Sequence, residues 1–142
     1  MLRNFIYANG LQEADVIIAK KRGWGVFDHF IIYMGIRYGQ HLFIANDAKG
    51  GVKWFTESEV INLIKDFSPV RIRRFSGNAS QKQLALTRAE REIGKSYSLV
   101  NFNCEHLANY VQYGVRESKQ VQNWGLGIAA GVLLAAFIFN ND

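Results

Sequence analysis

The sequence predicts an α+β domain in which an antiparallel sheet packs against helices. Short runs rich in β-branched and aromatic residues alternate with glycine-bearing turns, which is typical of strands. The second run pairs with the third across the short stretch 36–39, and so short a connection requires antiparallel pairing. Residues 1–12 are weakly patterned and predict a lead-in with one helical turn. Expected strands cover residues 15–19, 29–35, 42–46, 53–55 and 70–75, and expected helices cover 60–65, 80–93 and about 103–113.

Capping residues set the expected helix ends. Thr56 is answered three residues later by Glu59, which is the capping-box pattern and opens the first of these helices. Ser80 is the expected N-cap of the second helix, and Gly94 ends it. The only proline, Pro69, precedes the alternating pattern of the last strand, which predicts that one face of this strand is exposed.

Composition limits the class of protein. With 142 residues, of which 49% are hydrophobic and 20% charged, the chain suits one compact domain with a short appendage. A single cysteine excludes an internal disulfide, and no cysteine spacing suits a metal, so neither metal nor cofactor is expected. The net charge of +5 favours an anionic partner. Because no nucleic-acid motif accompanies the basic clusters at 20–22 and 71–74, we expect a membrane surface and no nucleic acid.

The C-terminal tail differs from the rest of the chain. Residues 124–139 carry no charge and no strongly polar side chain. A membrane-spanning helix needs about 20 apolar residues, with a lower limit near 17, so the stretch suffices if its amide flanks reach the headgroups. A buried terminal helix is the alternative, but a small domain hardly encloses a helix that is apolar on all faces. We therefore expect a domain at 1–119 and a hydrophobic helix, a membrane anchor, at 120–142.

The expected location follows from the two ends of the chain. No basic segment followed by a long apolar run stands at the start, so no secretory signal is expected. A lone thiol without an export signal suits a reducing compartment. Together with the tail, this predicts the cytoplasmic face of a membrane. Gly127 and Gly131 form a Gly-xxx-Gly pair, which permits self-association through the tail.

The only cysteine, Cys104, lies where a loop is expected to turn into a helix. Asn101 and Asn103 are good N-cap residues, and apolar residues follow at helical spacing. A thiol in the first helical turn faces unpaired N–H groups and the positive end of the helix dipole, which both favour the nucleophilic thiolate. Cys104 is therefore a candidate nucleophile, and burial as a small hydrophobic residue is the alternative.

Two segments carry a resemblance to a known family. Residues 103–107, Asn-Cys-Glu-His-Leu, resemble the Asn-Cys-Glu-His-Phe motif of the lecithin:retinol acyltransferase-like family, with leucine in place of phenylalanine. Residues 29–35, His-Phe-Ile-Ile-Tyr-Met-Gly, resemble its His-Trp-Ala-Ile-Tyr-Val-Gly segment. The resemblance implies a circularly permuted papain-like (NlpC-related) fold and a thiol acyltransferase or phospholipase, with Cys104 as nucleophile and His29 as general base.

A third residue usually orients the imidazole in such a site, and two candidates stay open. The family uses a second histidine, and His41 follows His29 at the family spacing of twelve residues. If the turn comes early, at 35–37, His41 falls diagonal to His29 on the same face. If the glycine-closed stretch 36–39 is the turn, Asn46 lies directly opposite His29. Because glycine at the turn is the better turn chemistry, we prefer Asn46 over His41.

The resemblance and the thiol together predict a membrane-associated, cysteine-dependent acyltransferase or phospholipase. Cys104 would attack a glycerophospholipid ester and form an acyl-thioester, which water or an amine or alcohol acceptor would then release. The expected partners are a phospholipid membrane, a donor lipid and an acceptor that the sequence does not identify. Two alternatives stay open: an NlpC-like cysteine peptidase or amidase, which needs export, and a non-catalytic membrane adaptor on the same fold.

Overall fold

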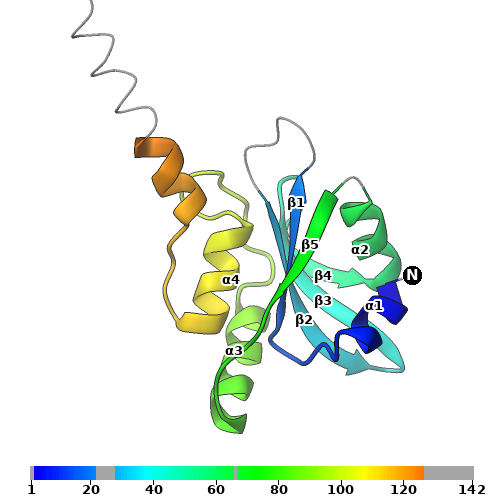
Figure 1. The fold of residues 1–142 in the computed structure, drawn as a ribbon. Coiled ribbons are helices and arrows are strands. Elements are labelled where there is room, and N and C mark those ends of the chain that lie inside the picture. The colour runs from blue at the N-terminus through cyan, green and yellow to red at the C-terminus, as the bar shows by residue number, and fades with distance from the viewer. Residues whose placement is uncertain (1, 22–27, 66, 127–142) are drawn as a thin grey trace, which may run out of the picture.

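The computed structural model describes residues 2–21, 28–65 and 67–126, and residues 1, 22–27, 66 and 127–142 lie outside the described part (Figure 1). Within the described residues, five strands and four labelled helices follow one another in the order α1 (Leu2–Ala8), β1 (Val16–Lys21), β2 (His29–Arg37), β3 (Gln40–Asp47), β4 (Gly51–Thr56), α2 (Glu57–Ile64), β5 (Phe67–Arg73), α3 (Ala79–Arg91) and α4 (Cys104–Tyr113). A fifth helical segment covers residues 119–126.

The strands form one antiparallel sheet in the order β4-β3-β2-β1-β5. Helices α3 and α4 cover one face of the sheet, and α1 and α2 lie on the other (Figure 1). The predicted α+β class with an antiparallel sheet packed on helices is therefore confirmed. The central strand, β2, is covered on both faces, as its nearly continuous apolar run requires.

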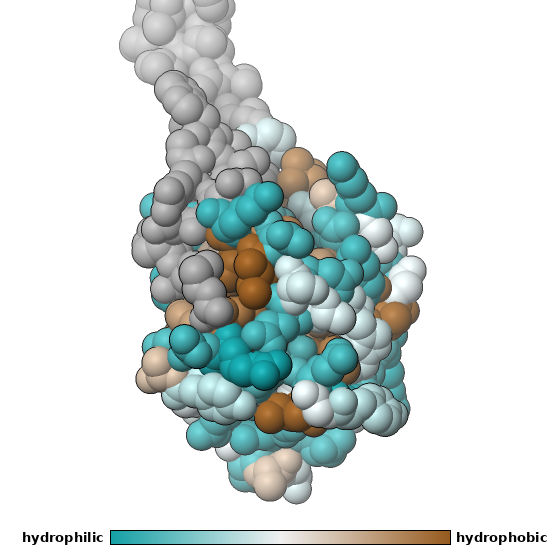
Figure 2. Space-filling model, turned by 90° about the vertical axis from the view of Figure 1, so that its right-hand side faces the viewer, coloured by the Kyte–Doolittle hydropathy of each residue, from teal (hydrophilic) through white to brown (hydrophobic). Residues whose placement is uncertain are grey.

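Alternation along the strands divides the buried residues between two cores. In β2, Phe30, Ile32 and Met34 face the core under α3 and α4, whereas Ile31 and Tyr33 face the core under α1 and α2. Helix α4 adds Cys104, Leu107, Ala108 and Val111 to the first of these cores. On the molecular face seen in Figure 2, apolar residues form only small patches among hydrophilic ones.

The β2–β3 hairpin turns within the predicted stretch. Tyr38 and Gly39 form its two-residue turn, and both have a positive φ, 55° and 74°. The register differs slightly from the expected one, because Ile31 pairs with Ala45 where residue 44 was expected. A register shift between Tyr33 and Ile36 accompanies this difference.

Two helix starts test the capping predictions. The predicted capping box of Thr56 and Glu59 at the start of α2 is confirmed. The predicted N-cap of α3, Ser80, was wrong. Asn78 caps this helix instead: its side-chain oxygen accepts the Gln81 N–H at 2.9 Å, and the Gln81 side chain accepts the Asn78 N–H at 2.8 Å. An asparagine with a glutamine three residues later is itself a capping box, so the helix begins at the earlier of two competent caps.

The predicted membrane anchor, 120–142, falls mainly on residues outside the described part. Within the described ranges, no helix combines the length and the apolar character that crossing a membrane requires. The helix at 119–126 belongs to the described part and begins the tail segment.

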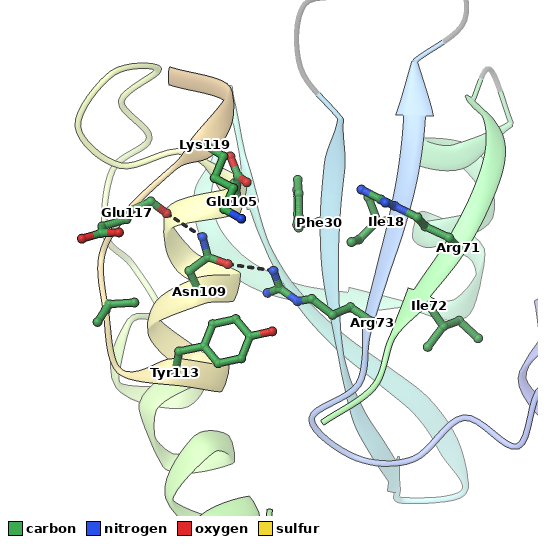
Figure 3. Close-up of a pocket in the computed structure, with 11 residues that line it drawn as sticks. Ile18, Phe30, Arg71, Ile72, Arg73, Glu105, Asn109, Tyr113, Glu117 and Lys119 are labelled. Carbon is green, nitrogen blue, oxygen red and sulfur yellow. Dashed lines mark hydrogen bonds between the residues drawn. The ribbon is translucent and has the colours of Figure 1, made fainter. Parts of the chain in front are cut away.

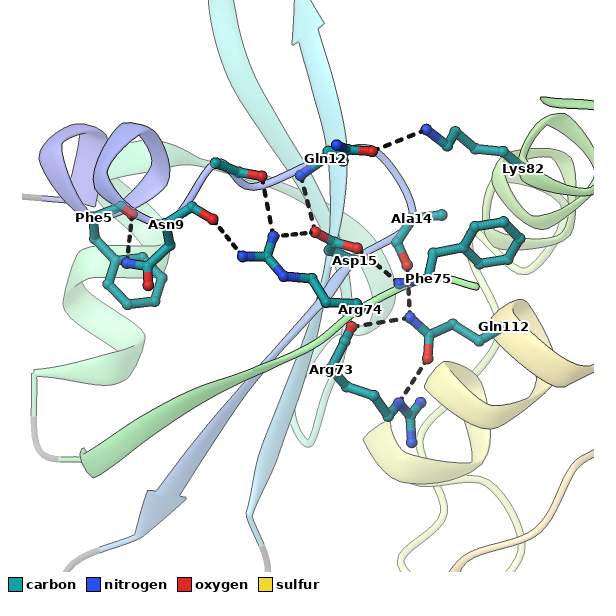
Figure 4. A network of polar contacts seen from close by, with 11 residues as sticks. Phe5, Asn9, Gln12, Ala14, Asp15, Arg73, Arg74, Phe75, Lys82 and Gln112 are labelled. Carbon is teal, nitrogen blue, oxygen red and sulfur yellow. Dashed lines mark hydrogen bonds and ion pairs between the residues drawn. The ribbon is translucent and has the colours of Figure 1, made fainter. Parts of the chain in front are cut away.

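A polar network ties the edge strand β5 to β1 and α4 (Figure 4). The Asp15 carboxylate accepts the Phe75 N–H at 2.8 Å and pairs with Arg74 at 2.8 Å. Gln112 of α4 donates to the carbonyl oxygens of Ala14 at 2.8 Å and Arg73 at 3.2 Å. Because α4 is bound to both strands, the position of its side chains relative to β5 is fixed.

Candidate active site

The site begins at the first residue of α4. Asn103 is the N-cap, and its side-chain oxygen accepts the N–H groups of Glu105 at 2.9 Å and His106 at 3.1 Å. The Asn103 N–H in turn donates to Nδ1 of His106 at 3.1 Å, so the two side chains form a capping box. His106 is thereby occupied as a structural residue, and burial lowers the pKa of its imidazole. Cys104 follows the cap in the first turn, as predicted.

The thiol of Cys104 lies against the backbone at the start of β2. Its Sγ donates to the carbonyl oxygen of Asp28 at 3.2 Å and receives the backbone N–H of Phe30. These two residues flank His29, the first residue of the strand. The structure therefore brings together the two segments that carry the resemblance, although 75 positions separate Cys104 from His29 in the chain.

The thiol occupies the edge of β2 that faces β3. Tyr33 exchanges backbone hydrogen bonds with Ala14 and Asp15 on the β1 side, so the N–H and C=O groups of even-numbered residues point toward β3. The ladder between β2 and β3 ends at the pair of Ile31 and Ala45. Beyond that pair, Sγ of Cys104 takes the place that β3 would have filled, and the sheet is split there.

Burial controls the protonation of this thiol. Cys104 is only 4% exposed, and burial raises its pKa to about 11, although N–H groups of Phe30, Cys104 and Glu105 oppose the rise. From the sequence, the helix start is expected to favour the thiolate. That expectation was wrong for the structure described, because the loss of water around a charged sulfur outweighs the donors of the helix start. The thiol is protonated at neutral pH, and its S–H donates a hydrogen bond to the carbonyl oxygen of Asp28.

His29 is half-buried and lies opposite Ala19 of β1. The alternation of β2 assigns its side chain to the face of Ile31 and Tyr33, opposite to the face covered by α4. Cys104 belongs to the core under α3 and α4, and its Sγ reaches the backbone of β2 at Asp28 and Phe30, on either side of His29.

Asn46 lies near the end of β3 and is 1% exposed. Its Nδ2 donates to the carbonyl oxygen of Phe102 at 2.8 Å, two residues before the nucleophile. Its Oδ1 is buried and has no hydrogen-bond partner among the described residues. Extending the observed register by two residues sets Asp47, and not Asn46, opposite His29. The expected direct pairing of Asn46 with His29 is therefore displaced by one residue.

His41 lies at the other end of the hairpin. It pairs with Ile36, close to the turn, and its Nδ1 is 2.8 Å from Oη of Tyr33 in a hydrogen bond. The ring of Tyr7 contacts His41 edge-on at a centroid distance of 5.6 Å. Seven strand positions separate Ile36 from His29, which is about 23 Å at 3.3 Å per residue. The structure does not bring His41 to the thiol.

Three further residues, which the sequence did not single out as site residues, bind the segment after α4 to the site. Glu105 accepts the Ser118 hydroxyl at 2.5 Å and the Gln120 N–H at 3.0 Å. Oε1 of Gln120 accepts the backbone N–H of Asp28 at 2.6 Å. One residue, Asp28, thus holds the tail segment with its N–H and the thiol with its carbonyl oxygen. Gln120 was missed because it falls inside the stretch assigned to the tail.

A pocket of about 480 Å³ opens between α4 and β5 (Figure 3). Phe30 and Glu105 contribute to its wall, and each neighbours the nucleophile in space or in sequence. Among the residues that the structure describes, no three His, Cys, Asp or Glu side chains lie where they could hold a metal ion together.

Comparison with known proteins identifies the family of this chain. A family model described as "Lecithin retinol acyltransferase" matches residues 10–117. A curated human protein, "Phospholipase A and acyltransferase 2" from Homo sapiens, is 31% identical over an alignment of 141 residues. That alignment covers 86% of this chain and 84% of the human protein. The match includes β2, β3 and the start of α4, so the chain belongs to the lecithin retinol acyltransferase family.

Proposed function

We propose that this chain is a membrane-associated phospholipase and acyltransferase that acts on glycerophospholipid esters through an acyl-thioester on Cys104. One observation carries the proposal: the only thiol of the chain lies at a helix start, against the backbone on both sides of His29. Family membership supports the reaction class, because the similar human protein is named for phospholipase and acyltransferase activities.

The raised pKa of the thiol makes a general base necessary. A free thiol at this pKa holds its proton at neutral pH, so attack requires a group that removes the proton as the bond forms. His29 directly follows Asp28, whose carbonyl oxygen accepts the hydrogen bond from the thiol. In the proposed reaction, Sγ attacks the ester carbonyl carbon while the imidazole takes the thiol proton.

The remaining steps balance the reaction. The imidazolium gives its proton to the leaving oxygen, the carbon–oxygen ester bond breaks, and a lysophospholipid departs while the acyl group stays on sulfur. Water, an amine or an alcohol then attacks the thioester carbonyl, with the imidazole again taking the proton. Cleavage of the carbon–sulfur bond regenerates the thiol and yields a fatty acid, an amide or a new ester. Water makes the chain a hydrolase, and the other acceptors make it a transferase.

Asn46 is our candidate for the residue that orients the imidazole. Its amide nitrogen donates to the carbonyl oxygen of Phe102, and its buried amide oxygen has no partner among the described residues. A buried acceptor without a partner suits an imidazole N–H. Asp47 is nearer in register to His29, but it is half-buried and lies 3.8 Å from Lys53 in an ion pair. His41 is the weaker candidate, because its Nδ1 is bonded to Tyr33.

Membrane association and a cytoplasmic-face location remain part of the proposal. The net charge of +5 suits anionic lipid, and the apolar stretch at 124–139 supplies a candidate anchor that would also permit self-association. The division into 1–119 and 120–142 is proposed on the change in composition at the tail, and the permuted papain-like relation, in which histidine precedes cysteine, on the family resemblance. Sedimentation with vesicles tests the anchor: full-length protein should pellet, and protein lacking residues 124–142 should stay in the supernatant.

The central experiment measures both turnover and the covalent intermediate. Wild type and Cys104→Ser are incubated with phospholipid in mixed micelles, and intact protein mass is recorded at early times. We expect release of fatty acid and a mass increase of one acyl group in wild type, and neither in Cys104→Ser. Peptidoglycan fragments serve as the second substrate. Cleavage of these fragments alone would favour a peptidase, and inertness toward both substrates would favour an adaptor.

A further inference from the structure

Arg73 is held in an unusual way. Its Nε donates to Oε1 of Gln112 at 2.6 Å, and its Nη1 donates to Oδ1 of Asn109 at 2.7 Å. Both partners are neutral amides. The third nitrogen, Nη2, is buried and has no partner among the described residues. No ion pair between described residues involves Arg73.

Two other arginines show how a structural arginine is held in this protein. Arg74 pairs with the carboxylate of Asp15 at 2.8 Å, and Arg116 pairs with that of Glu92 at 2.8 Å. Each of these cations is neutralised by a carboxylate. Arg73 has no carboxylate of the described residues within ion-pair distance, although it is half-buried where Arg74 and Arg116 are exposed. Burial lowers the pKa of its guanidinium, and the negative charge of Glu105 on the same pocket wall offsets only part of this effect. A half-buried cation that no carboxylate pairs directly is stabilised by an anionic ligand.

The amides that hold Arg73 are themselves fixed. Nε2 of Gln112 donates to the carbonyl oxygens of Ala14 and Arg73, and Nδ2 of Asn109 donates to that of Glu117 at 2.7 Å. Both amide oxygens therefore have to face the guanidinium. The ring of Tyr113 lies 5.0 Å from its central carbon. The guanidinium is thus oriented before any ligand arrives, which reduces the entropy lost on binding.

The pocket beside Arg73 has the composition of a site for an amphipathic anion (Figure 3). Ile18, Phe30 and Val115 supply apolar wall, and Arg71 and Lys119 add positive charge. Two carboxylates, Glu105 and Glu117, also line the pocket, but that of Glu105 is engaged by Ser118 and Gln120.

We propose that this pocket binds the phosphodiester of a glycerophospholipid, with Arg73 donating its free Nη2–H to a phosphate oxygen. A planar guanidinium matches phosphate geometry, and a charge-assisted hydrogen bond is the stronger kind. The location suits the chemistry, because Phe30 lines the pocket while its N–H binds Sγ of Cys104. With its phosphate bound at Arg73, the same lipid would extend its ester-bearing part toward the thiol. The assignment to a lipid rests on the proposed function, whereas the anion site itself does not.

The first test measures binding without catalysis. Full-length Cys104→Ala, in detergent micelles, is titrated with glycerophosphocholine, inorganic phosphate and glycerol, and amide chemical shifts are followed. Glycerophosphocholine should bind, glycerol should not, and shifts should concentrate at residues 71–73 and 109–113. Loss of one charge-assisted bond in the additional variant Arg73→Gln should weaken binding roughly 10- to 150-fold. Equal binding of glycerophosphocholine by Arg73→Gln overturns the site, and tighter binding of inorganic phosphate overturns the lipid assignment.

The second test compares substrates. We expect Arg73→Gln to lower the ratio of kcat/KM for a short-chain phosphatidylcholine to kcat/KM for a neutral diacylglycerol by the same roughly 10- to 150-fold. Arg91→Gln removes an equal charge from the exposed end of α3, away from the pocket, and should leave the ratio unchanged. Arg73→Lys, which keeps the charge, should give an intermediate ratio and serves as the readout if Arg73→Gln does not fold.

The outcomes separate this inference from the proposed function. If wild type hydrolyses phosphatidylcholine and the ratio is unchanged in both Arg73 variants, the phosphate site is refuted and the phospholipase proposal stands. If wild type hydrolyses neither ester, the phospholipase proposal fails, and the titration of Cys104→Ala still decides whether Arg73 binds phosphate.

Discussion

The two ends of the β2–β3 hairpin hold their polar residues in opposite ways. At the closed end, next to the turn, His41 is buried and bonded to Tyr33, so its polar group is satisfied. At the open end, the strands separate, Cys104 inserts against the edge of β2, and Oδ1 of Asn46 has no partner among the described residues. Unsatisfied buried groups are rare where only stability is at stake. The difference supports the proposal that the open end is the functional one.

The largest expected effect separates the two histidines. His29→Gln should lower kcat/KM for phospholipid by about 10²–10⁴-fold, the range attributed to a positioned general base. His41→Gln should stay within a few-fold of wild type in activity and should lower the free energy of unfolding, since it disturbs a buried hydrogen bond worth about 1–3 kcal/mol when broken. Steady-state kinetics and thermal unfolding of both variants check this. Loss of activity in His41→Gln with a normal melting temperature would reverse the assignment of the two ends.

The second prediction sharpens the comparison within the open end. Asn46→Ala should lower kcat by about 10- to 100-fold with little change in KM, because an orienting residue acts through the imidazole and does not bind substrate. Asp47→Ala, its neighbour on β3, is the matched control and should remain within a few-fold. The pH dependence of kcat adds a readout that a purely structural residue would not move: the apparent pKa of the base should shift in Asn46→Ala. If Asp47→Ala lowers kcat more than Asn46→Ala does, the orienting residue is Asp47, which the strand register sets opposite His29.

The third prediction concerns the protonation of the thiol. Since the pKa of Cys104 is about 11, two units above its ordinary value of 9.0, iodoacetamide should label the resting protein about 100-fold more slowly than an unperturbed thiol at pH 8. The same shift affects stability. The thiol's contribution is fully present below about pH 9 and is lost as the pH rises through 11, on the order of 3 kcal/mol in all. Chemical denaturation of wild type and Cys104→Ala between pH 8 and 11 measures the difference in slope, and equal slopes would contradict a buried neutral thiol.

Sequence patterns predicted the sheet, the helix that carries Cys104 and the turn of the hairpin, because each of these is set by local chemistry. Period-two runs define the strands, Asn103 caps α4, and a glycine closes the turn. The pKa of the thiol could not be predicted, because it depends on how completely distant segments exclude water from Cys104. The register was displaced by one residue for a similar reason: the irregularity between Tyr33 and Ile36 has no sequence signature that we recognised.

The polar partners of the site were harder still to predict. Gln112 and Asn109 of α4 look like the polar side of an amphipathic helix, and only the packing of α4 against β5 directs their oxygens toward Arg73. Gln120 lies in a stretch whose composition suggested a tail, and its role follows from a contact with Asp28, 92 positions earlier in the chain. Contacts between segments so far apart in sequence leave no local pattern.

The smallest expected effect tests whether the segment after α4 supports the open end. Gln120→Ala removes the side-chain oxygen that accepts the backbone N–H of Asp28. The carbonyl oxygen of Asp28 accepts the hydrogen bond from the thiol of Cys104. A neutral hydrogen bond contributes about 0.5–1.5 kcal/mol, so kcat should fall by roughly 2- to 12-fold. Gln122→Ala, two positions later and exposed, is the matched control and should match wild type. If Asp28 loosens in Gln120→Ala, water gains access to the sulfur, and iodoacetamide should label Cys104 faster than in either wild type or the control. An unchanged labelling rate together with an unchanged kcat would show that the segment contacts the site without supporting it.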